Sequence, residues 1–274
     1  SPCPGGPKCN QLAYLVEGHD GVDLHLVSSE DSPSSDRLAG TGRPFYFSWT
    51  RGQGGSEGLM AWHTGPGGSA ARPRLALYDP SGDRIRELGQ TPGSFLAPAW
   101  SPQGDRWLAV TAKDGKHQLR LFVGDRPGPV LVTAEHELAF SWSPDGRYVA
   151  FASRARRDDP FYAPVHVIDM RSGRARRLTG EAFRIRGFFW APTPDASSPD
   201  RQRLAYLTWL DLPDGDRSQW RVIDVTGSED RGFAVFNPSP LMRFAIHSFG
   251  QYAQSHRFWS PDGRYLVYTD RDRT

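Results

Sequence analysis

Lysine, cysteine and long apolar stretches are all scarce in this sequence of 274 residues. Only Lys8, Lys113 and Lys116 are lysines among the 33 basic residues, and the net charge of +2 does not by itself indicate a nucleic-acid partner. No run of about 18 apolar residues occurs, so the sequence predicts no membrane span. Cys3 and Cys9, the only cysteines, are separated by turn residues, which leaves open a local disulfide or two free thiols.

The sequence also lacks motifs for catalysis or metal binding. Residues 54–58 match Gly-x-Ser-x-Gly, but they lie between two expected strands and not at the strand-to-helix turn that a nucleophile such as Ser56 requires. The eight histidines show no His-Glu-x-x-His pattern, and the Asp-Gly pairs fit hairpin turns, not calcium loops. Helical periodicity is almost absent, so no glycine-rich loop opens a phosphate-binding helix. We therefore predict no enzyme activity, no cofactor and no metal.

Glycine, proline and aromatic residues, by contrast, are abundant, and a tryptophan recurs in similar surroundings. The chain has 29 glycines, 23 prolines and 12% aromatic residues, a composition typical of many short strands joined by tight turns. Successive tryptophans of the repeat are 51, 42, 48 and 69 residues apart, and a period in the forties is the length of one four-stranded propeller blade. The aligned tryptophans are Trp49, Trp100, Trp142, Trp190 and Trp259.

Each repeat predicts the same order of strands and turns. A short apolar strand ends at the tryptophan, and Ser-Pro-Asp-Gly follows as a tight turn, in which proline presets φ and glycine tolerates positive φ. A second strand such as 148–152 comes next, then a third such as 165–169, and then a short fourth such as 176–179.

The sequence therefore predicts an all-β fold, a β-propeller of about six four-stranded blades in one domain. Residues 11–15 match a second strand with no first strand before them, and the last repeat stops after its second strand, near residue 269. We expect the first and last blades to be incomplete here and the chain to be part of a longer protein. The expected blades lie near 1–40, 41–89, 90–133, 134–180, 181–236 and 237–274.

The motif Trp-Ser-Pro-Asp-Gly-Arg-Tyr at 142–148 and 259–265, followed by an apolar strand, resembles the repeat of the TolB-like family of bacterial propellers. The same repeat builds the propellers of prolyl-oligopeptidase-type peptidases. The resemblance implies a periplasmic or extracellular, non-catalytic protein that binds other proteins. It carries over no binding residue to a position of this sequence.

The loops that carry insertions in some repeats indicate where binding is expected. Loops that precede the first strand and loops that join strands two and three share one rim of a propeller, and the insertions gather there, whereas the turns on the other rim stay short. This rim is the predicted binding face, with surface decoration as the alternative. The insertions are residues 64–73, 154–163, 210–219 and 237–256.

Two groups of residues are the candidates for binding on this rim. Tyr252, His256 and Arg257 precede the first strand of the last repeat and could line the mouth of the channel, or could pack against a neighbouring blade. The equivalent positions in other repeats, expected to form a ring around that mouth, are Tyr46, Phe95, His136 and Arg186.

The second group is Arg156, Phe161 and Tyr162, in a loop that mixes arginines, carboxylates and aromatics expected to be exposed. This composition is typical of protein interfaces, and internal ion pairs are the alternative. The basic run 171–177 falls on the opposite rim, so the two basic segments form no nucleic-acid stripe.

The function predicted from the sequence is that of a non-catalytic, extracytoplasmic module for protein binding, sensing or scaffolding. Its partner is expected to be another protein or a peptide, with a small ligand at the channel mouth as a further option and no nucleic acid. Two alternatives stay open. One is the gating propeller of a prolyl-oligopeptidase-type serine peptidase, and the other is a small-molecule-binding or hydrolytic propeller that uses the axial channel.

Overall fold

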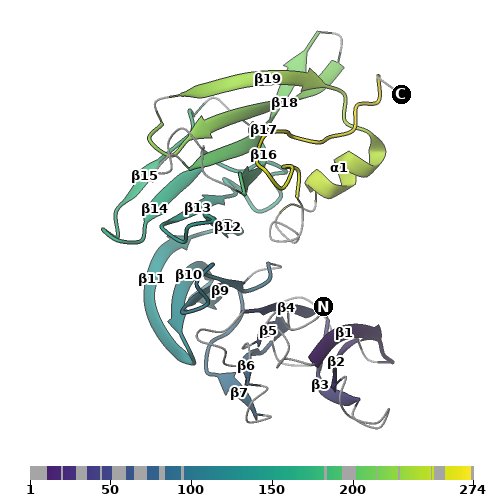
Figure 1. Cartoon of the computed structure of the whole chain (residues 1–274), viewed down its shortest axis with the longest axis vertical. Helices are drawn as coiled ribbons and strands as arrows, with labels where there is room; N and C mark the ends of the chain where they lie inside the picture. The colour runs from purple at the N-terminus through teal and green to yellow at the C-terminus, as the bar shows by residue number, and fades with distance from the viewer. Residues whose placement is uncertain are drawn as a thin grey trace. The chain divides into compact units, whose positions relative to one another are not determined.

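The structure is a computed structural model that describes residues 11–19, 21–28, 36–43, 45–50, 60–64, 73–79, 84–93, 96–181, 184–192, 202–213, 215–227, 229–247, 249 and 257–272. Within these residues it contains strands β1 to β19 and one helix, α1. Residue contacts divide the chain into two compact units, Ser1–Glu135 and His136–Thr274. The strands of each unit form successive small sheets (Figure 1).

In the N-terminal unit, the first three repeats form three separate antiparallel sheets in which strands consecutive in the sequence are neighbours. The first sheet has three strands among the described residues, and the other two have four. The strands are β1 (Gln11–Glu17), β2 (Val22–Ser28) and β3 (Arg37–Gly42), then β4 (Phe45–Trp49), β5 (Met60–Thr64), β6 (Leu75–Asp79) and β7 (Arg84–Leu88), then β8 (Ala99–Trp100), β9 (Trp107–Lys113), β10 (Lys116–Val123) and β11 (Arg126–Ala134).

The C-terminal unit continues the pattern with two four-stranded sheets, which isolated bridges follow in the last repeat. Their strands are β12 (Leu138–Trp142), β13 (Tyr148–Ser153), β14 (His166–Asp169) and β15 (Ala175–Arg177), then β16 (Arg184–Trp190), β17 (Arg203–Leu212), β18 (Gly215–Asp224) and β19 (Asp230–Phe236). In the last repeat, Trp259 pairs with Leu266 as an isolated bridge. The predicted order of one antiparallel sheet per repeat is thus confirmed for the first five repeats; among the described residues the first sheet has three strands and the last repeat has isolated bridges.

The Ser-Pro-Asp-Gly segment forms the predicted turn. The Ser143 hydroxyl donates to Asp145 at 2.5 Å and accepts from the Tyr148 backbone N–H at 2.8 Å, so one side chain closes the turn from both sides. Ser260, Asp262 and Tyr265 repeat this arrangement in the last repeat. The turn glycines have φ of 69° at Gly146 and 67° at Gly263, a conformation that costs other residues steric energy.

The recurring tryptophan connects neighbouring sheets. The indole N–H of Trp100 donates to the backbone oxygen of Ser48 at 3.0 Å, Trp190 does the same to Ser141 at 3.1 Å, and Trp259 to Phe189 at 3.0 Å. In each case the acceptor immediately precedes the tryptophan of the preceding repeat. This explains why the repeat needs tryptophan, because phenylalanine or tyrosine lacks a donor at that place on the ring.

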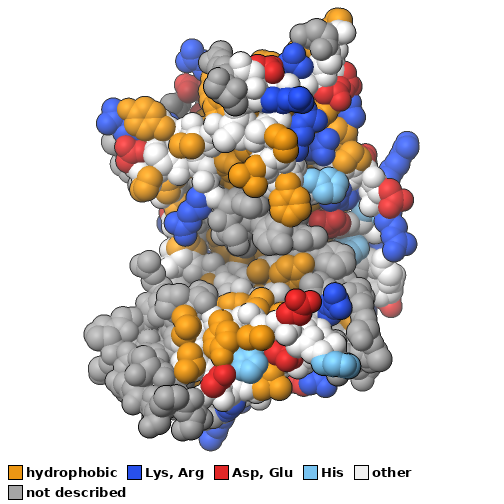
Figure 2. All heavy atoms as spheres, turned by 90° about the vertical axis from the view of Figure 1, so that its right-hand side faces the viewer, with side chains coloured by type: hydrophobic (Ala, Val, Ile, Leu, Met, Phe, Trp, Pro, Cys, Tyr) orange, Lys and Arg blue, Asp and Glu red, His pale blue; other side chains and the backbone are white. Residues whose placement is uncertain are grey.

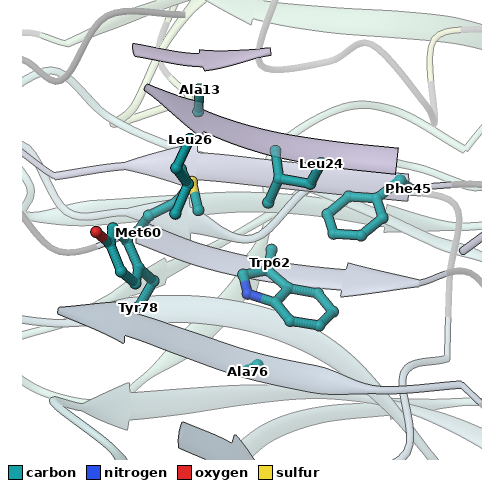
Figure 3. Close-up of a cluster of buried hydrophobic side chains, with 8 residues drawn as sticks. All are labelled: Ala13, Leu24, Leu26, Phe45, Met60, Trp62, Ala76 and Tyr78. Carbon is teal, nitrogen blue, oxygen red and sulfur yellow. The ribbon is translucent and has the colours of Figure 1, made fainter. Parts of the chain in front are cut away.

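Apolar side chains fill the space between adjacent sheets. Figure 3 shows such a cluster between the first two sheets, with Leu24 of β2 beside Phe45 of β4, Leu26 of β2 beside Met60 of β5, and Trp62 of β5 near Phe45. The Phe45 and Trp62 rings stack with centroids 4.9 Å apart. Burial of such residues on both faces of the inner strands agrees with the apolar runs seen in the sequence.

Two predictions about loops were wrong. Residues 210–219, expected as a rim loop, are mostly paired, because β17 and β18 extend as one long hairpin in which Leu210 faces Arg217 and Leu212 faces Gly215. The long connection 237–256, expected without helix, contains α1 (Pro240–His247). Among the described residues, no helix is long and apolar enough to cross a membrane.

His63 in β5 gives the N-terminal unit an expected pH dependence. It is buried, its Nε2 lies 2.6 Å from the Leu96 oxygen, and burial lowers the pKa of its imidazole below the ordinary value. The unfolded chain takes up this proton near pH 6.5, so it binds more protons than the folded chain below that pH. Stability is therefore complete above about pH 6.5 and falls as the pH drops towards the lower folded-state pKa.

We expect the urea midpoint to fall between about pH 7.5 and 5.5, and to fall less in His63→Phe. The variant keeps an aromatic ring against Tyr46, whose own ring centroid is 5.2 Å from that of His63. Urea titrations of both proteins across this range measure the difference. Equal falls of the urea midpoint in the two proteins would contradict the assignment of this pH dependence to His63.

Candidate binding site: an arginine pocket in the C-terminal unit

Several segments of the C-terminal unit meet at one end of its sheets. The loop 154–163 pairs with the start of β16, where the Tyr162 N–H donates to the Ile185 oxygen at 2.8 Å. The Phe161 ring of the same loop lies 6.2 Å from the Trp209 ring near the end of β17. Helix α1 joins them, because the Arg243 guanidinium lies 6.0 Å from the Trp209 ring. Segments far apart in the sequence therefore build one site.

Arg186 is placed in this site by a β-bulge. In the pairing of β16 with β17, Ile185 faces Thr208 and Gly187 faces Leu207, so Arg186 is an extra residue with no partner in the ladder. A bulge bends the strand and redirects the side chain of its extra residue. Arg186 is half-buried, whereas its neighbours Ile185 and Gly187 are buried.

The Arg186 guanidinium packs on aromatic rings. Its Cζ lies 4.4 Å from the centre of the Phe161 ring and 4.6 Å from that of Trp209, both within the range of a cation–π interaction. Its Nε is buried and has no hydrogen-bond partner among the described residues. Contact with the rings holds the guanidinium in place without satisfying its N–H donors.

A cavity of about 350 Å³ opens beside this guanidinium. We call it the arginine pocket and define it by its lining residues: Arg186, Trp209, Pro238, Arg243, Phe244, Ile246 and His247. None of these described lining residues is a carboxylate. The pocket therefore combines two permanent positive charges with aromatic and apolar surface. Figure 2 shows the side of the molecule that carries α1, with blue arginine or lysine side chains among orange hydrophobic ones in the C-terminal unit.

The other arginines of this region have acceptors. Arg154 donates to Glu137 at 2.8 Å, Arg184 pairs with Asp211, and Arg243 donates to the Pro238 oxygen at 3.0 Å and to Asn237 at 2.9 Å. Arg243 thus binds neutral oxygens and keeps its charge uncompensated by a carboxylate in the described part of the chain.

Electrostatics around Arg186 disfavour its charge. Its pKa is lowered from the ordinary value, first by burial and then by the guanidiniums of Arg184, Arg154 and Arg243, while Asp159 acts in the opposite direction. Arginine nevertheless stays protonated in proteins. The folded chain therefore carries a positive charge whose free energy is raised by burial and by the neighbouring guanidiniums. A bound anion would lower that free energy.

A hydrogen-bonded platform supports the loop that carries Phe161. Glu137 accepts from both Arg154 Nε, at 2.8 Å, and the Tyr162 hydroxyl, at 3.1 Å. Burial and the neighbouring Glu137 raise the pKa of the Tyr162 phenol well above its ordinary value. Asp159 accepts from the Phe161 backbone N–H at 2.9 Å. These contacts fix the ring on which Arg186 rests.

Helix α1 forms one wall of the pocket, and its sequence explains its start. Ser239 accepts from the Met242 N–H at 3.2 Å as an N-cap, and Pro240 occupies the first helical position, where no N–H is needed. Met242 and Ile246 face inward, while Leu241 and Phe244 are 75% and 64% exposed. The helix thus presents apolar side chains to solvent beside the arginines.

Three of the residues predicted from the sequence lie together at this site: Arg186, Phe161 and Tyr162. The expectation that the two aromatics are exposed was wrong, because Phe161 and Tyr162 are only 8% and 4% exposed. They pack under Arg184, Arg186 and Arg154 and support the site from below. Arg156, on the same loop, is exposed.

The remaining predicted residues are dispersed or not described. Tyr46 is half-buried in the N-terminal unit, His136 is half-buried before β12, and Arg257 is exposed. Phe95, Tyr252 and His256 lie outside the described residues, as do Ser56 and both cysteines. The ring that these positions were predicted to form stays a prediction.

Sequence reasoning missed Trp209, Arg243 and Phe244. Trp209 lies just before the segment 210–219 that was expected to be a rim loop, and the two helix residues lie in the segment 237–256 that was also expected to be a loop. The Ser239-Pro240 pair was the signal that could have indicated a helix start.

These repeated four-stranded antiparallel sheets are the blades of a β-propeller. No family model matches the sequence, and no curated protein matches it. Among solved structures, the chain is similar to a TolB-type protein of Agrobacterium tumefaciens, with a TM-score of 0.52 and 17% identity over 97% of this chain and 88% of that one. It is also similar to the β-propeller domain of the Trilobed protease from Pyrococcus furiosus, with a TM-score of 0.53 and 11% identity over 82% of this chain and 68% of that one.

A third similar structure is an oligogalacturonate lyase in complex with manganese, with a TM-score of 0.56 and 12% identity over 84% of this chain and 63% of that one. Several of the matching proteins are longer, and the chain spans 54% to 63% of their length. Proteins named for different activities share this fold, so the fold alone assigns no chemistry. Among the described residues, no group of three His, Cys, Asp or Glu side chains could hold a metal ion.

Proposed function

We propose that the chain is a non-catalytic binding module that works outside the cytoplasm and holds another protein or a peptide at the arginine pocket. Support for the location comes from the Trp-Ser-Pro-Asp-Gly repeat, which resembles that of the TolB-like family. Support for the binding role comes from the site. The β-bulge presents a half-buried arginine whose Nε has no acceptor, and α1 presents exposed Leu241 and Phe244 beside it.

This combination is what protein interfaces use. Arginine and large aromatic side chains are enriched among the residues that contribute most binding energy, and they act best when apolar neighbours exclude water. Leu241 and Phe244 lie in the first turns of α1, so a partner could bury both of them while reaching the pocket. The described lining residues offer guanidinium N–H donors and apolar side chains, which suit the binding of a partner that has acceptor groups and apolar surface.

The test is a selection of random dodecapeptides, displayed on phage, against the immobilised chain. We expect enriched peptides whose affinity falls at least about tenfold when Phe244→Asp or Leu241→Asp removes apolar surface and adds a charge. The matched control is Val123→Asp, which changes an exposed valine in the N-terminal unit. A set of peptides that binds both α1 variants as tightly as the unchanged chain would refute the proposal.

A further inference from the structure

The charges around the arginine pocket are unbalanced, and this imbalance indicates its ligand. Its lining contains Arg186, Arg243 and His247, and no carboxylate among the described lining residues. Two acidic side chains of this region are paired with other arginines, Asp211 with Arg184 and Glu137 with Arg154. Asp159, whose charge acts on Arg186, accepts from the Phe161 backbone N–H and lines a second cavity that Phe161 also lines, not the arginine pocket.

The geometry of Arg186 favours a planar, two-oxygen acceptor. The centres of the Phe161 and Trp209 rings lie 4.4 and 4.6 Å from its guanidinium carbon, and a guanidinium that contacts ring faces can still form hydrogen bonds through its terminal N–H groups. Guanidinium N–H groups at one edge form two parallel hydrogen bonds to a carboxylate. Arg243 could contact the same anion, because both arginines line the cavity.

The surroundings of the anion site are apolar. Phe244 and Ile246 line the pocket, Trp209 forms part of it, and Leu241 is exposed one helical turn earlier than Phe244. A free inorganic anion would leave this apolar surface in water. A peptide with an acidic residue next to a large apolar residue would satisfy the arginines and cover Phe244 and Leu241 together.

We propose that the arginine pocket binds the carboxylate of an aspartate or glutamate in a peptide segment that also carries a neighbouring large apolar side chain. This inference rests on the proposed function and specifies its ligand chemistry. Arg186 provides the paired hydrogen bonds, Arg243 the second positive charge, and Phe244 and Leu241 the apolar contact.

The test continues from the dodecapeptide selection. We expect the enriched sequences to contain Asp or Glu beside Leu, Ile, Phe or Trp. In fluorescence anisotropy with one synthetic labelled peptide, Arg186→Gln should weaken binding about 10- to 100-fold, as should Glu→Gln in the peptide. Combining both changes should weaken binding little further, because each removes the same interaction.

The control variant is Arg231→Gln, which removes an exposed arginine of β19 outside the pocket and should leave affinity unchanged. A second readout separates binding from a structural role. Arg186→Met keeps an unbranched side chain against the two rings, and it should melt at the same or a higher temperature, because burial and the neighbouring guanidiniums disfavour the charge that it removes. A clear fall in melting temperature would show that Arg186 serves stability and would overturn the inference.

Other outcomes are equally informative. Peptides that depend on Phe244 but contain no acidic residue, or that bind Arg186→Gln normally, would overturn this inference and leave the proposed function standing. Displacement of the labelled peptide by oligogalacturonate or inorganic phosphate at lower concentration than by the unlabelled peptide would overturn the assignment to a peptide carboxylate. If no enriched peptide bound the Leu241→Asp and Phe244→Asp variants more weakly than the unchanged chain, the proposed function itself would be refuted.

Discussion

Replacing Phe249 with alanine is expected to destabilise the C-terminal unit by about 3–5 kcal/mol, the usual cost of removing a buried phenylalanine ring. Phe249 is 0% exposed, and its ring centroid lies 5.7 Å from that of Tyr162, 5.0 Å from that of Phe188 and 5.2 Å from that of Phe189. It follows α1 closely in the sequence. Its loss would create a cavity and release the helix that forms one wall of the arginine pocket.

Urea denaturation followed by tryptophan fluorescence measures this effect, and Leu241→Ala on the exposed face of α1 is the matched control. That control should change the free energy of unfolding by no more than about 0.5 kcal/mol. Gly187→Ala tests the same contact from the other side, because a Cβ there would come within 3.0 Å of Phe249 Cδ2. We expect it to cost about 1–3 kcal/mol. If Phe249→Ala were as mild as Leu241→Ala, the packing assigned to Phe249 would be wrong.

Replacing Glu137 with alanine is expected to cost about 2–4 kcal/mol, because it leaves two donors without their acceptor. The Arg154 and Glu137 side chains are 16% and 27% exposed, so this pair is partly shielded from water and from salt. The change should also weaken peptide binding, because Arg154 and Tyr162 hold the loop that positions Phe161 under Arg186.

Glu181→Ala is the matched control for this prediction. It removes the carboxylate of the Arg177–Glu181 ion pair, whose side chains are 48% and 77% exposed, and should cost no more than about 1 kcal/mol. The loss of stability in Glu137→Gln should lie between those of Glu137→Ala and Glu181→Ala, since the amide oxygen can still accept one hydrogen bond. Thermal melts and the anisotropy assay on the same samples report both effects. Equal losses for Glu137→Ala and Glu181→Ala would argue against the platform.

The strands and turns could be predicted from the sequence because each is determined by local residues. Serine, proline, aspartate and glycine specify the turn after Trp142 and Trp259 through hydrogen bonds within a few residues, and the structure contains those bonds. The period of the tryptophan then gives one sheet per repeat. The indole hydrogen bond to the preceding repeat could not be predicted, because it joins residues that are about 50 to 70 positions apart.

The site was predicted in part only, for three physical reasons. The bulge at Arg186 leaves no trace in the alternation of Arg-Ile-Arg-Gly, so its redirected side chain cannot be read from that pattern. Helix α1 has eight residues, too few for periodicity to identify it. Phe161 and Tyr162 lie in a charged loop, which suggests exposure, yet they are buried under the arginines of β16 and of their own loop.

The single extra residue in β16 also makes the charge that Arg186 brings to the pocket independent of the scaffold. Deleting one codon at this place would let Ile185 and the following residues pair in continuous register with β17, and the strand would become more regular as the cation disappeared. Related proteins could therefore gain or lose this guanidinium through a one-residue length change, without altering any side chain that builds the sheets.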